Sequence, residues 1–280
     1  MKIFNSLLLI CGLSVFSGCK SSSSHFTVFK DLNYTSSNSE RQSGDLYLPK
    51  TGRAHSVALV IHGGGWTGRD RSDMASVSKQ LAGLGIAAYN INYRLAPEHH
   101  YPAQLEDVHA ALNYLELNKD RWSLNTRCTI TVGYSAGAHL ALLAAEIPGA
   151  NTPEISGVIV GGSPVDLKLY PDSPFILKLM GGTLAEKPKL WQAASPINYV
   201  TQNHPPVFLF HGQFDQIVGL NNAEIMLSKL NSAGVPAELD LRLLKGHILV
   251  GFFQRSSIKK GVDFLNEKID GGLISYAQIK

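Results

Sequence analysis

Thr129-Ile-Thr-Val-Gly-Tyr-Ser135-Ala-Gly-Ala-His-Leu-Ala-Leu-Leu-Ala-Ala145 is the stretch that decides the fold. Residues 129–132 form a short β-branched run that predicts a strand, and residues 136–145 predict a helix directly after it. Between them lies the pattern Gly-x-Ser-x-Gly, centred on Ser135. A serine in so tight a strand-to-helix turn is pushed out of the sheet, and the glycines two residues away on each side relieve the crowding. Ser135 is therefore predicted to be a nucleophile exposed at the end of a central strand.

The rest of the chain repeats the same alternation of short apolar runs and longer amphipathic ones. Such alternation predicts βα units, that is, an α/β fold with a mostly parallel central sheet flanked by helices. The 280 residues, 44% of them hydrophobic, suffice for one domain of this kind. Further strands are expected at residues 26–34, 45–48, 57–61, 86–93, 158–160, 207–210 and 239–243, and further helices at 72–84, 103–117, 221–233 and 252–265.

Three glycines follow the strand predicted at residues 57–61, in the sequence His-Gly-Gly-Gly-Trp at residues 62–66. Acyl transfer builds negative charge on a carbonyl oxygen, which hydrogen-bond donors about 3 Å away can stabilise. Glycines let backbone N–H groups approach that oxygen without an intervening side chain. We expect Gly64 and Gly65 to supply two such groups, and Ala136, the residue after the nucleophile, to supply the third.

The acid and the base that serve a serine nucleophile follow it in the order Asp or Glu, then His, in the α/β-hydrolase fold. Asp215 lies just after the predicted strand 207–210, and His247 just after the predicted strand 239–243. The carboxyl ends of parallel strands meet at one edge of a sheet, where Ser135 is also expected. We therefore predict that His247 takes the proton of Ser135 and that Asp215 orients the imidazole.

Other residues compete for these two roles. Asp166 is the second candidate for the acid, although a capping role is expected for it, and Asp240 falls inside a strand. His139 is expected to pack behind Ser135. The remaining histidines considered for the base are His62, interpreted as organising the glycine loop, together with His99, His100, His204 and His211.

The alternation breaks at residues 161–205, before the penultimate strand. This stretch is rich in Pro and Gly and carries apolar residues that look exposed, namely Phe175, Ile176, Leu179, Met180 and Trp191. A long excursion inside a compact fold is usually functional. We interpret it as a cap-like insertion that forms a wall of the site, and a purely structural insertion at the sheet edge is the alternative.

Several motifs in this order resemble the hormone-sensitive-lipase-like and feruloyl-esterase-like carboxylesterases of the α/β-hydrolase superfamily. Besides the glycine loop at residues 62–66, they are Gly-Tyr-Ser-Ala-Gly-Ala-His-Leu at 133–140, Tyr-Arg-Leu-Ala-Pro-Glu at 93–98, Tyr-Pro-Ala-Gln-Leu-Glu-Asp at 101–107 and Ala-Ser-Pro-Ile at 194–197. The resemblance covers about residues 26–266. It implies that Arg94, Glu98 and Asp107 form a scaffold behind the site.

The segment around the acid points to one branch of that superfamily. Gly212 precedes Asp215 and Val218 follows it, as in the feruloyl-esterase-like and peptidase-like branch, and the Asp-Pro-Leu of the strict lipase-like branch is missing. The resemblance therefore implies a serine carboxylesterase acting on short acyl or aromatic esters of small molecules. A peptidase or aryl formamidase, and an inactive envelope binding protein, are the alternatives.

The expected partners follow from the same resemblance and from the charge. We expect no cofactor and no metal, because a serine, a histidine and a carboxylate suffice for acyl transfer. The formal net charge is +3, and no Lys/Arg block interrupts the body of the chain. That balance gives no reason to expect nucleic acid as a partner. The sequence leaves the oligomeric state open.

The first residues differ from the rest of the chain. Residues 1–18 have the layout of a signal peptide, with Lys2 ahead of an apolar run. Phe-Ser-Gly-Cys at residues 16–19 resembles the lipobox of bacterial lipoproteins, which implies lipidation of Cys19 and attachment to a membrane of the bacterial cell envelope. Residues 19–25 then form a flexible tether, 26–268 the hydrolase domain and 269–280 a C-terminal tail. Cys128 is left as a single cysteine in the body, expected to be a small buried residue.

Overall fold

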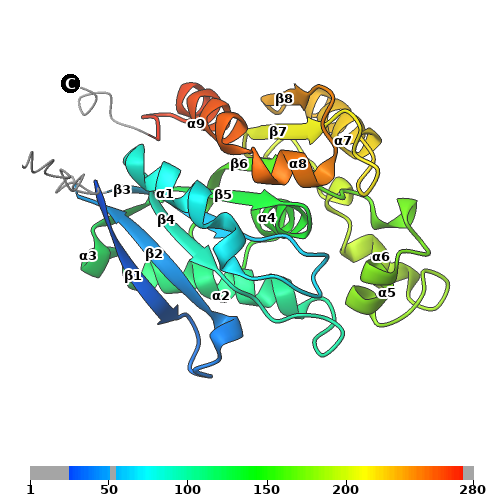
Figure 1. Ribbon diagram of the computed structural model, residues 1–280, viewed down its shortest axis with the longest axis horizontal. Helices are drawn as coiled ribbons and strands as arrows, with labels where there is room; N and C mark the ends of the chain where they lie inside the picture. Colours follow the sequence, from blue (N-terminus) through cyan, green and yellow to red (C-terminus); the bar gives the residue numbers. More distant parts are fainter. Residues whose placement is uncertain (1–24, 51–54, 274–280) are drawn as a thin grey trace, which may run out of the picture.

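One central sheet organises the chain. The computed structural model describes residues 25–50 and 55–273. In this part, eight strands pair in the order β1-β2-β4-β3-β5-β6-β7-β8 (Figure 1). The pairs β1–β2 and β2–β4 are antiparallel and all others are parallel, which confirms the predicted fold. The strands are β1 Phe26–Asn33, β2 Ser43–Pro49, β3 His55–Ile61, β4 Ala87–Ile91, β5 Leu124–Tyr134, β6 Ile155–Gly161, β7 Val207–Gly212 and β8 Ala237–Arg242.

The register of the central strands brings the two main motifs together. β3 and β4 are buried along their whole length, as their continuous apolar runs require in a sheet covered on both faces. In the pairing of β3 with β5, Val60 lies opposite Val132 and Ile61 opposite Gly133. The glycine loop after Ile61 and the turn after Gly133 therefore leave the sheet side by side.

Helices cover both faces of the sheet (Figure 1). Residues of α1 and α9 share one hydrophobic cluster, and residues of α2, α4 and α7 share the other. No helix of the described ranges is long and apolar enough to cross a membrane. The helices are α1 Ala75–Gly83, α2 Ala103–Leu117, α3 Lys119–Trp122, α4 Ala136–Glu146, α5 Pro174–Met180, α6 Pro188–Ala193, α7 Asn221–Ser232, α8 His247–Phe252 and α9 Arg255–Lys268.

The insertion between β6 and β7 contains α5 and α6 and packs beside the body of the domain (Figure 1). It is tied down by backbone hydrogen bonds, for example from the Tyr101 N–H to the Leu179 carbonyl (2.8 Å). The exposure expected for its apolar residues is wrong for four of the five. Ile176, Leu179, Met180 and Trp191 are buried, because they face the hydrophobic cluster around α2 and α4, and only Phe175 is exposed.

Some elements differ from the sequence-based expectation. The helix predicted at 252–265 is α9, which begins three residues later at Arg255, and the short α8 before it was not expected. The short helix α3 and the extension of β5 back to Leu124 were not expected. Cys128 is half-buried in β5 rather than fully buried. Residues 1–24, which carry the predicted signal and Cys19, lie outside the described residues.

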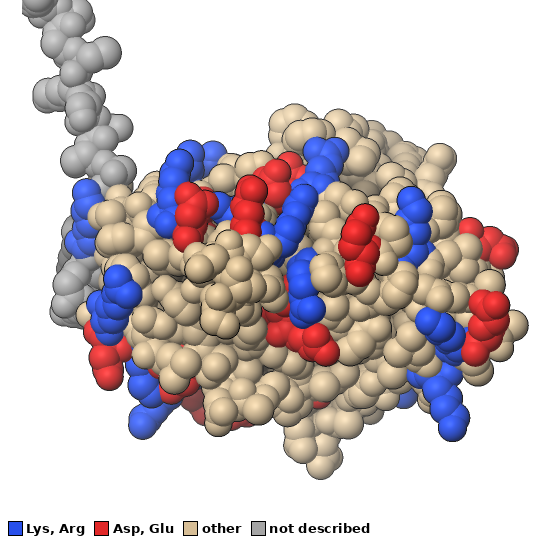
Figure 2. All heavy atoms as spheres, turned by 90° about the horizontal axis from the view of Figure 1, so that it is seen from below, with Lys and Arg blue, Asp and Glu red and all other residues tan. Residues whose placement is uncertain are grey.

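Surface charges of both signs are interspersed on one face of the molecule. Figure 2 shows this face, seen from below relative to Figure 1, with Lys and Arg alternating with Asp and Glu. It lies opposite α8 and α9, which are at the top of Figure 1. No area of a single sign dominates this face.

Candidate active site

Ser135 lies in the turn between β5 and α4, with φ 54° and ψ −122°. A non-glycine residue in this conformation is strained, and such strain is a common feature of functional sites. Close backbone contacts surround the turn. A Cβ atom on Gly133 would lie 2.3 Å from the Gly137 carbonyl oxygen, and one on Gly137 would lie 2.2 Å from the Ile61 carbonyl oxygen. Both positions therefore require glycine, as the motif predicts.

The glycine loop after β3 lies directly against this turn. A Cβ atom on Gly63 would lie 3.2 Å from the Ser135 Cβ. Gly64 and Gly65 have φ of +107° and +60°, which favour glycine. The loop is held from behind by Tyr93, whose hydroxyl donates to the His62 carbonyl (3.0 Å). The backbone of Gly64 and Gly65 is therefore placed next to the serine.

Asp215 and His247 meet at the same edge of the sheet. Asp215 Oδ2 lies 2.6 Å from His247 Nδ1. The other carboxylate oxygen accepts the N–H groups of Ile217 (3.0 Å) and Val218 (2.9 Å). Burial opposes ionisation of Asp215, but the hydrogen bond and charge of His247 outweigh it and hold the pKa of Asp215 below its usual range. The ionised carboxylate accepts a hydrogen bond from Nδ1–H, and in this tautomer Nε2 is free to act as a base.

A pair of glycines at the end of β6 connects the serine turn to His247. The Gly161 carbonyl accepts the Ser135 N–H (2.8 Å), and the Gly162 N–H donates to the Phe210 carbonyl (3.1 Å). A Cβ atom on Gly162, where φ is +56°, would lie 2.9 Å from Cε1 of His247. The imidazole therefore packs directly on the backbone that holds the serine.

Tyr134 adds a second connection. Its hydroxyl donates to the backbone carbonyl of His247, and the two rings lie 5.0 Å apart. The residue before the serine thus fixes the position of the histidine loop. Only the aromatic residue in the motif points to this contact, whereas a glycine pair after a strand is a recognisable sign of close backbone approach.

His211 also lies beside Asp215, although its place in the chain order argued against it as the base. Its Nε2 donates to the Val218 carbonyl (2.8 Å) and lies 3.4 Å from Asp215 Oδ2. Burial lowers the pKa of His211 and so keeps the ring neutral. His211 therefore closes the loop that carries Asp215 rather than replacing His247.

The other competing residues have structural contacts. His139 is buried behind the serine, donates from Nε2 to the Ala194 carbonyl (2.7 Å) and lies 5.0 Å from the Trp66 ring. Asp166 caps a short helical turn through the Lys168 N–H (3.1 Å). Asp240 accepts hydrogen bonds from Ser257 and Lys260.

The remaining histidines and the scaffold residues either make structural contacts or are exposed. His62 stacks on Tyr93, His204 contacts Glu146, and His99 and His100 are exposed before α2. Arg94 pairs with buried Asp107, with 2.9 Å between Nε and Oδ1. Glu98 is exposed and forms no ion pair with another residue of the described ranges.

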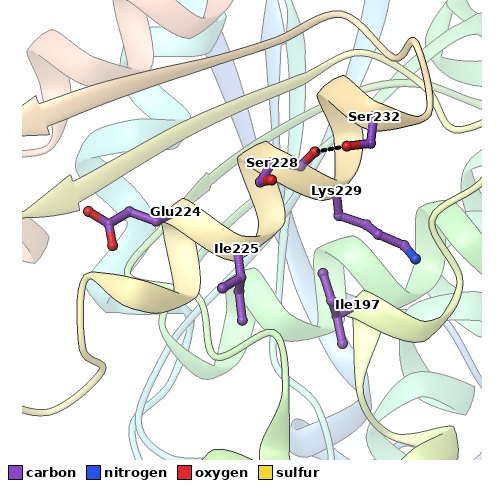
Figure 3. A pocket seen from close by; sticks show the side chains of 6 residues that line it. All are labelled: Ile197, Glu224, Ile225, Ser228, Lys229 and Ser232. Carbon is purple, nitrogen blue, oxygen red and sulfur yellow. Dashed lines mark hydrogen bonds between the residues drawn. The ribbon is translucent and has the colours of Figure 1, made fainter.

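An open depression of about 450 Å³ lies between α7 and Ile197 (Figure 3). Its lining mixes Glu224, Lys229, Ile225 and two serines and includes none of the predicted site residues. Within residues 25–50 and 55–273, no group of three or more His, Cys, Asp or Glu side chains is placed to hold a metal ion.

A family model described as BD-FAE matches residues 44–230, which include the glycine loop, the serine turn and Asp215. The chain belongs to the BD-FAE family. Esterase LipC of Mycobacterium tuberculosis (strain ATCC 25618 / H37Rv) is 26% identical to this BD-FAE protein over 194 residues, which cover 63% of this chain and 48% of LipC. The aligned part thus spans about half the length of LipC and of similar curated relatives.

Two other proteins match more of the chain. A solved structure described as a truncated form of a carbohydrate esterase from gut microbiota superimposes with a TM-score of 0.80 and 26% identity, covering 88% of this chain and 98% of that one. Kynurenine formamidase of Meyerozyma guilliermondii is 25% identical over 235 residues, covering 78% of this chain and 87% of the formamidase. The BD-FAE fold is thus shared with enzymes named for ester and for amide hydrolysis.

Proposed function

We propose that this BD-FAE protein is a serine carboxylesterase in which Ser135 is the nucleophile, His247 the base and Asp215 the residue that orients the base. The observation that carries the proposal is the 2.6 Å contact between Asp215 and His247, on a histidine that packs against the backbone holding Ser135. The esterase names of several relatives support the reaction class.

The reaction proceeds in two halves. His247 Nε2 takes the proton of Ser135 as its oxygen attacks the ester carbonyl carbon, and the backbone N–H groups of Gly64, Gly65 and Ala136 stabilise the resulting oxyanion. The carbon–oxygen bond to the alcohol then breaks, and His247 returns the proton to the departing alkoxide. Water, deprotonated by His247, attacks the acyl-serine, and the acid leaves as Ser135 is reprotonated.

A fluorophosphonate probe tests the nucleophile. The full chain should be labelled, and labelling should disappear in Ser135→Ala while the fold, measured by circular dichroism, stays intact. Ser163→Ala is a matched control, because Ser163 is a buried serine close to the same edge and lies outside the proposed chemistry. A wild-type chain that resists labelling, or a Ser135→Ala variant that keeps it, would remove this proposal.

The proposed substrates are short acyl or aromatic esters, with acyl groups on sugars as one class. The description of the similar gut structure as a carbohydrate esterase supports this choice. The position of Phe175, on the insertion, gives structural support for the same choice. Its side chain is half-exposed and so close to Gly65 that a Cβ there would lie 2.7 Å from the ring. An aromatic wall beside the oxyanion loop suits a planar acyl group or a sugar face.

Hydrolysis of an amide is the second candidate, because the kynurenine formamidase relative covers most of both chains. The same serine, histidine and glycine loop would carry that reaction. Matched pairs of aryl esters and aryl formamides, assayed as kcat/KM, separate the two. A preference for the formamide would replace the ester assignment.

We also propose that the protein is attached to the cell envelope through a lipid on Cys19. The support is the sequence at residues 1–19, which lie outside the described residues. Cys19→Ser should move the protein from the membrane fraction to the soluble fraction. Unchanged membrane association would count against lipidation.

A further inference from the structure

A group of exposed apolar side chains surrounds the edge of the sheet that carries Asp215 and His247. We call it the apolar rim and define it by residues from two loops and α8, namely Phe214, Ile217, Leu243, Leu244, Ile248, Leu249, Phe252 and Phe253, all exposed. Side chains this large are normally buried, and a contiguous apolar surface usually marks a place where something binds.

Hydrogen bonds and a ring contact hold the rim together as one surface. The Phe214 N–H donates to the Lys245 carbonyl (3.0 Å), and Gln213 Oε1 accepts the Leu244 N–H (3.3 Å). Lys245 Nζ in turn lies 5.5 Å from the centre of the Phe253 ring. The loop after β7, the loop after β8 and α8 are therefore neighbours, and Figure 1 shows β7, β8 and α8 close together in the upper part of the molecule.

Leu244 shows that the rim is not explained by folding. Its φ is +56°, a left-handed conformation that destabilises a leucine relative to glycine or asparagine. Its side chain is 78% exposed, so packing within the chain does not offset that strain. A leucine here costs folding energy and contributes no buried surface in return. Strain of this kind is expected where a residue serves binding.

The charges beside the rim indicate what it binds. Residues 242–260 contain five Lys and Arg and no Asp or Glu. Arg242 and Lys260 pair with Asp240, and Lys259 pairs with Asp263, both outside this stretch. Lys245 lies over Phe253, and Arg255 is exposed just beyond α8. Exposed apolar side chains next to cations are typical of segments that lie on anionic lipid surfaces. The interspersed charges of the opposite face (Figure 2) show no such pattern.

The same charges argue against a second copy as the occupant. A two-fold dimer would place rim against rim. Lys245 and Arg255 of the two copies would then face cations instead of acids, because the rim segments at residues 212–220 and 242–260 contain a single acid, buried Asp215. An anionic surface that needs no matching shape fits the rim better than a second copy of the chain does.

We propose that the apolar rim docks on a lipid surface that carries anionic headgroups. The edge with Asp215 and His247 then faces the lipid, and esters that partition into it reach the site from that side. This inference concerns binding and goes beyond the proposed reaction, so it is tested independently of the identity of the nucleophile.

Hydrogen exchange on the full chain tests the location of the contact. Vesicles of phosphatidylcholine and phosphatidylglycerol in equal parts should slow exchange of backbone amides at residues 243–254, and vesicles of phosphatidylcholine alone should do so less. This readout separates the rim from any attachment through the N-terminus. Vesicle binding without slower exchange at 243–254 would overturn the proposal.

Leu244→Asn tests the strained residue. We expect vesicle affinity to fall more than about tenfold, since an apolar side chain is lost from the contact. We also expect the unfolding midpoint to rise, because asparagine tolerates the left-handed conformation. Leu117→Asn is the matched control, because Leu117 is 76% exposed on α2, away from the rim. Equal losses of affinity in the two variants would overturn the proposal.

Arg255→Gln tests the charge. A cation near an anionic surface contributes about a fivefold gain in affinity, so this variant should lose about that factor on the anionic vesicles and nothing on phosphatidylcholine. Sedimentation velocity without vesicles tests whether the rim binds a second copy of the chain. A wild-type dimer that Leu244→Asn converts to monomer would assign the rim to a second copy and refute the lipid surface.

Discussion

The buried pair of Glu146 and His204 should make the stability of the protein depend on pH in a way that one substitution removes. Glu146 ends α4, and its Oε1 lies 3.0 Å from His204 Nε2. The other ring nitrogen, Nδ1, lies 2.7 Å from the Pro205 carbonyl and must donate to it. In the tautomer with its proton on Nδ1, Nε2 is an acceptor, which suits a protonated Glu146. Burial raises the pKa of Glu146 to about 7, from an ordinary 4.5.

The size of the effect follows from this shift. The folded state holds the Glu146 proton more tightly than the unfolded chain, so the stabilisation is complete below pH 4.5 and is lost as pH rises towards 7. The difference between a pKa of 4.5 and one of about 7, at 1.36 kcal/mol per pH unit, corresponds to about 3 kcal/mol between pH 4 and pH 8. In a domain of this size that is roughly 6 to 12 °C in melting temperature.

Glu146→Gln keeps the hydrogen bond to His204 and removes the titration. We expect the variant to match the wild type at pH 4 and to exceed its unfolding free energy by about 3 kcal/mol at pH 8. Urea denaturation at the two pH values measures the difference, and Glu154→Gln is the control at an exposed glutamate. Wild type and Glu146→Gln curves that change in parallel with pH would show that the pair is not held in the protonated form.

Three further predictions concern the site. Asp215→Asn should lower kcat by about 10⁴ in an ester assay, because His247 would lose the tautomer that leaves Nε2 free; a small loss would transfer the role to another acid. Gly162→Ala should lower kcat more than tenfold at similar KM, because the new Cβ would push on His247, and Gly68→Ala, which meets nothing within 4 Å, should not. In His139→Gln the free energy of unfolding should fall less between pH 6.5 and pH 4 than in the wild type. Burial lowers the pKa of His139 to about 4, so its neutral form stabilises the fold above pH 6.5 and this contribution is lost as pH falls. An equal fall in the two proteins would contradict this.

The parts of the fold and site that follow from local pattern could be predicted from the sequence. Helix α2 has the predicted bounds, because a proline precedes it and its apolar stripe is regular. Asp215 and His247 were predicted as partners from their places after two parallel strands, and the structure brings them to 2.6 Å. For Asp215 and His247, the topology of the parallel sheet limits where the two residues can lie.

What depends on side-chain direction or on loop conformation could not be predicted. The predicted helix start at Phe252 is wrong, because Phe252 and Phe253 face solvent instead of the core and α9 begins only at Arg255. His211 contacts Asp215 only because the loop after β7 folds back on itself. The left-handed conformation of Leu244 could not be predicted either, because the residue at that position is neither glycine nor asparagine.

The glycine pair at the end of β6 separates two tasks along the chain. β6 extends to Gly161, so the contacts of Gly161 and Gly162 with Ser135, Phe210 and His247 are made at the end of this strand, ahead of the helices of the insertion. The insertion rejoins the sheet at β7 and adds Phe175 beside the glycine loop from outside. Because most of the insertion is packed into the core, exposed Phe175 is the position at which substrate preference is expected to change without disturbing the residues that break the bond.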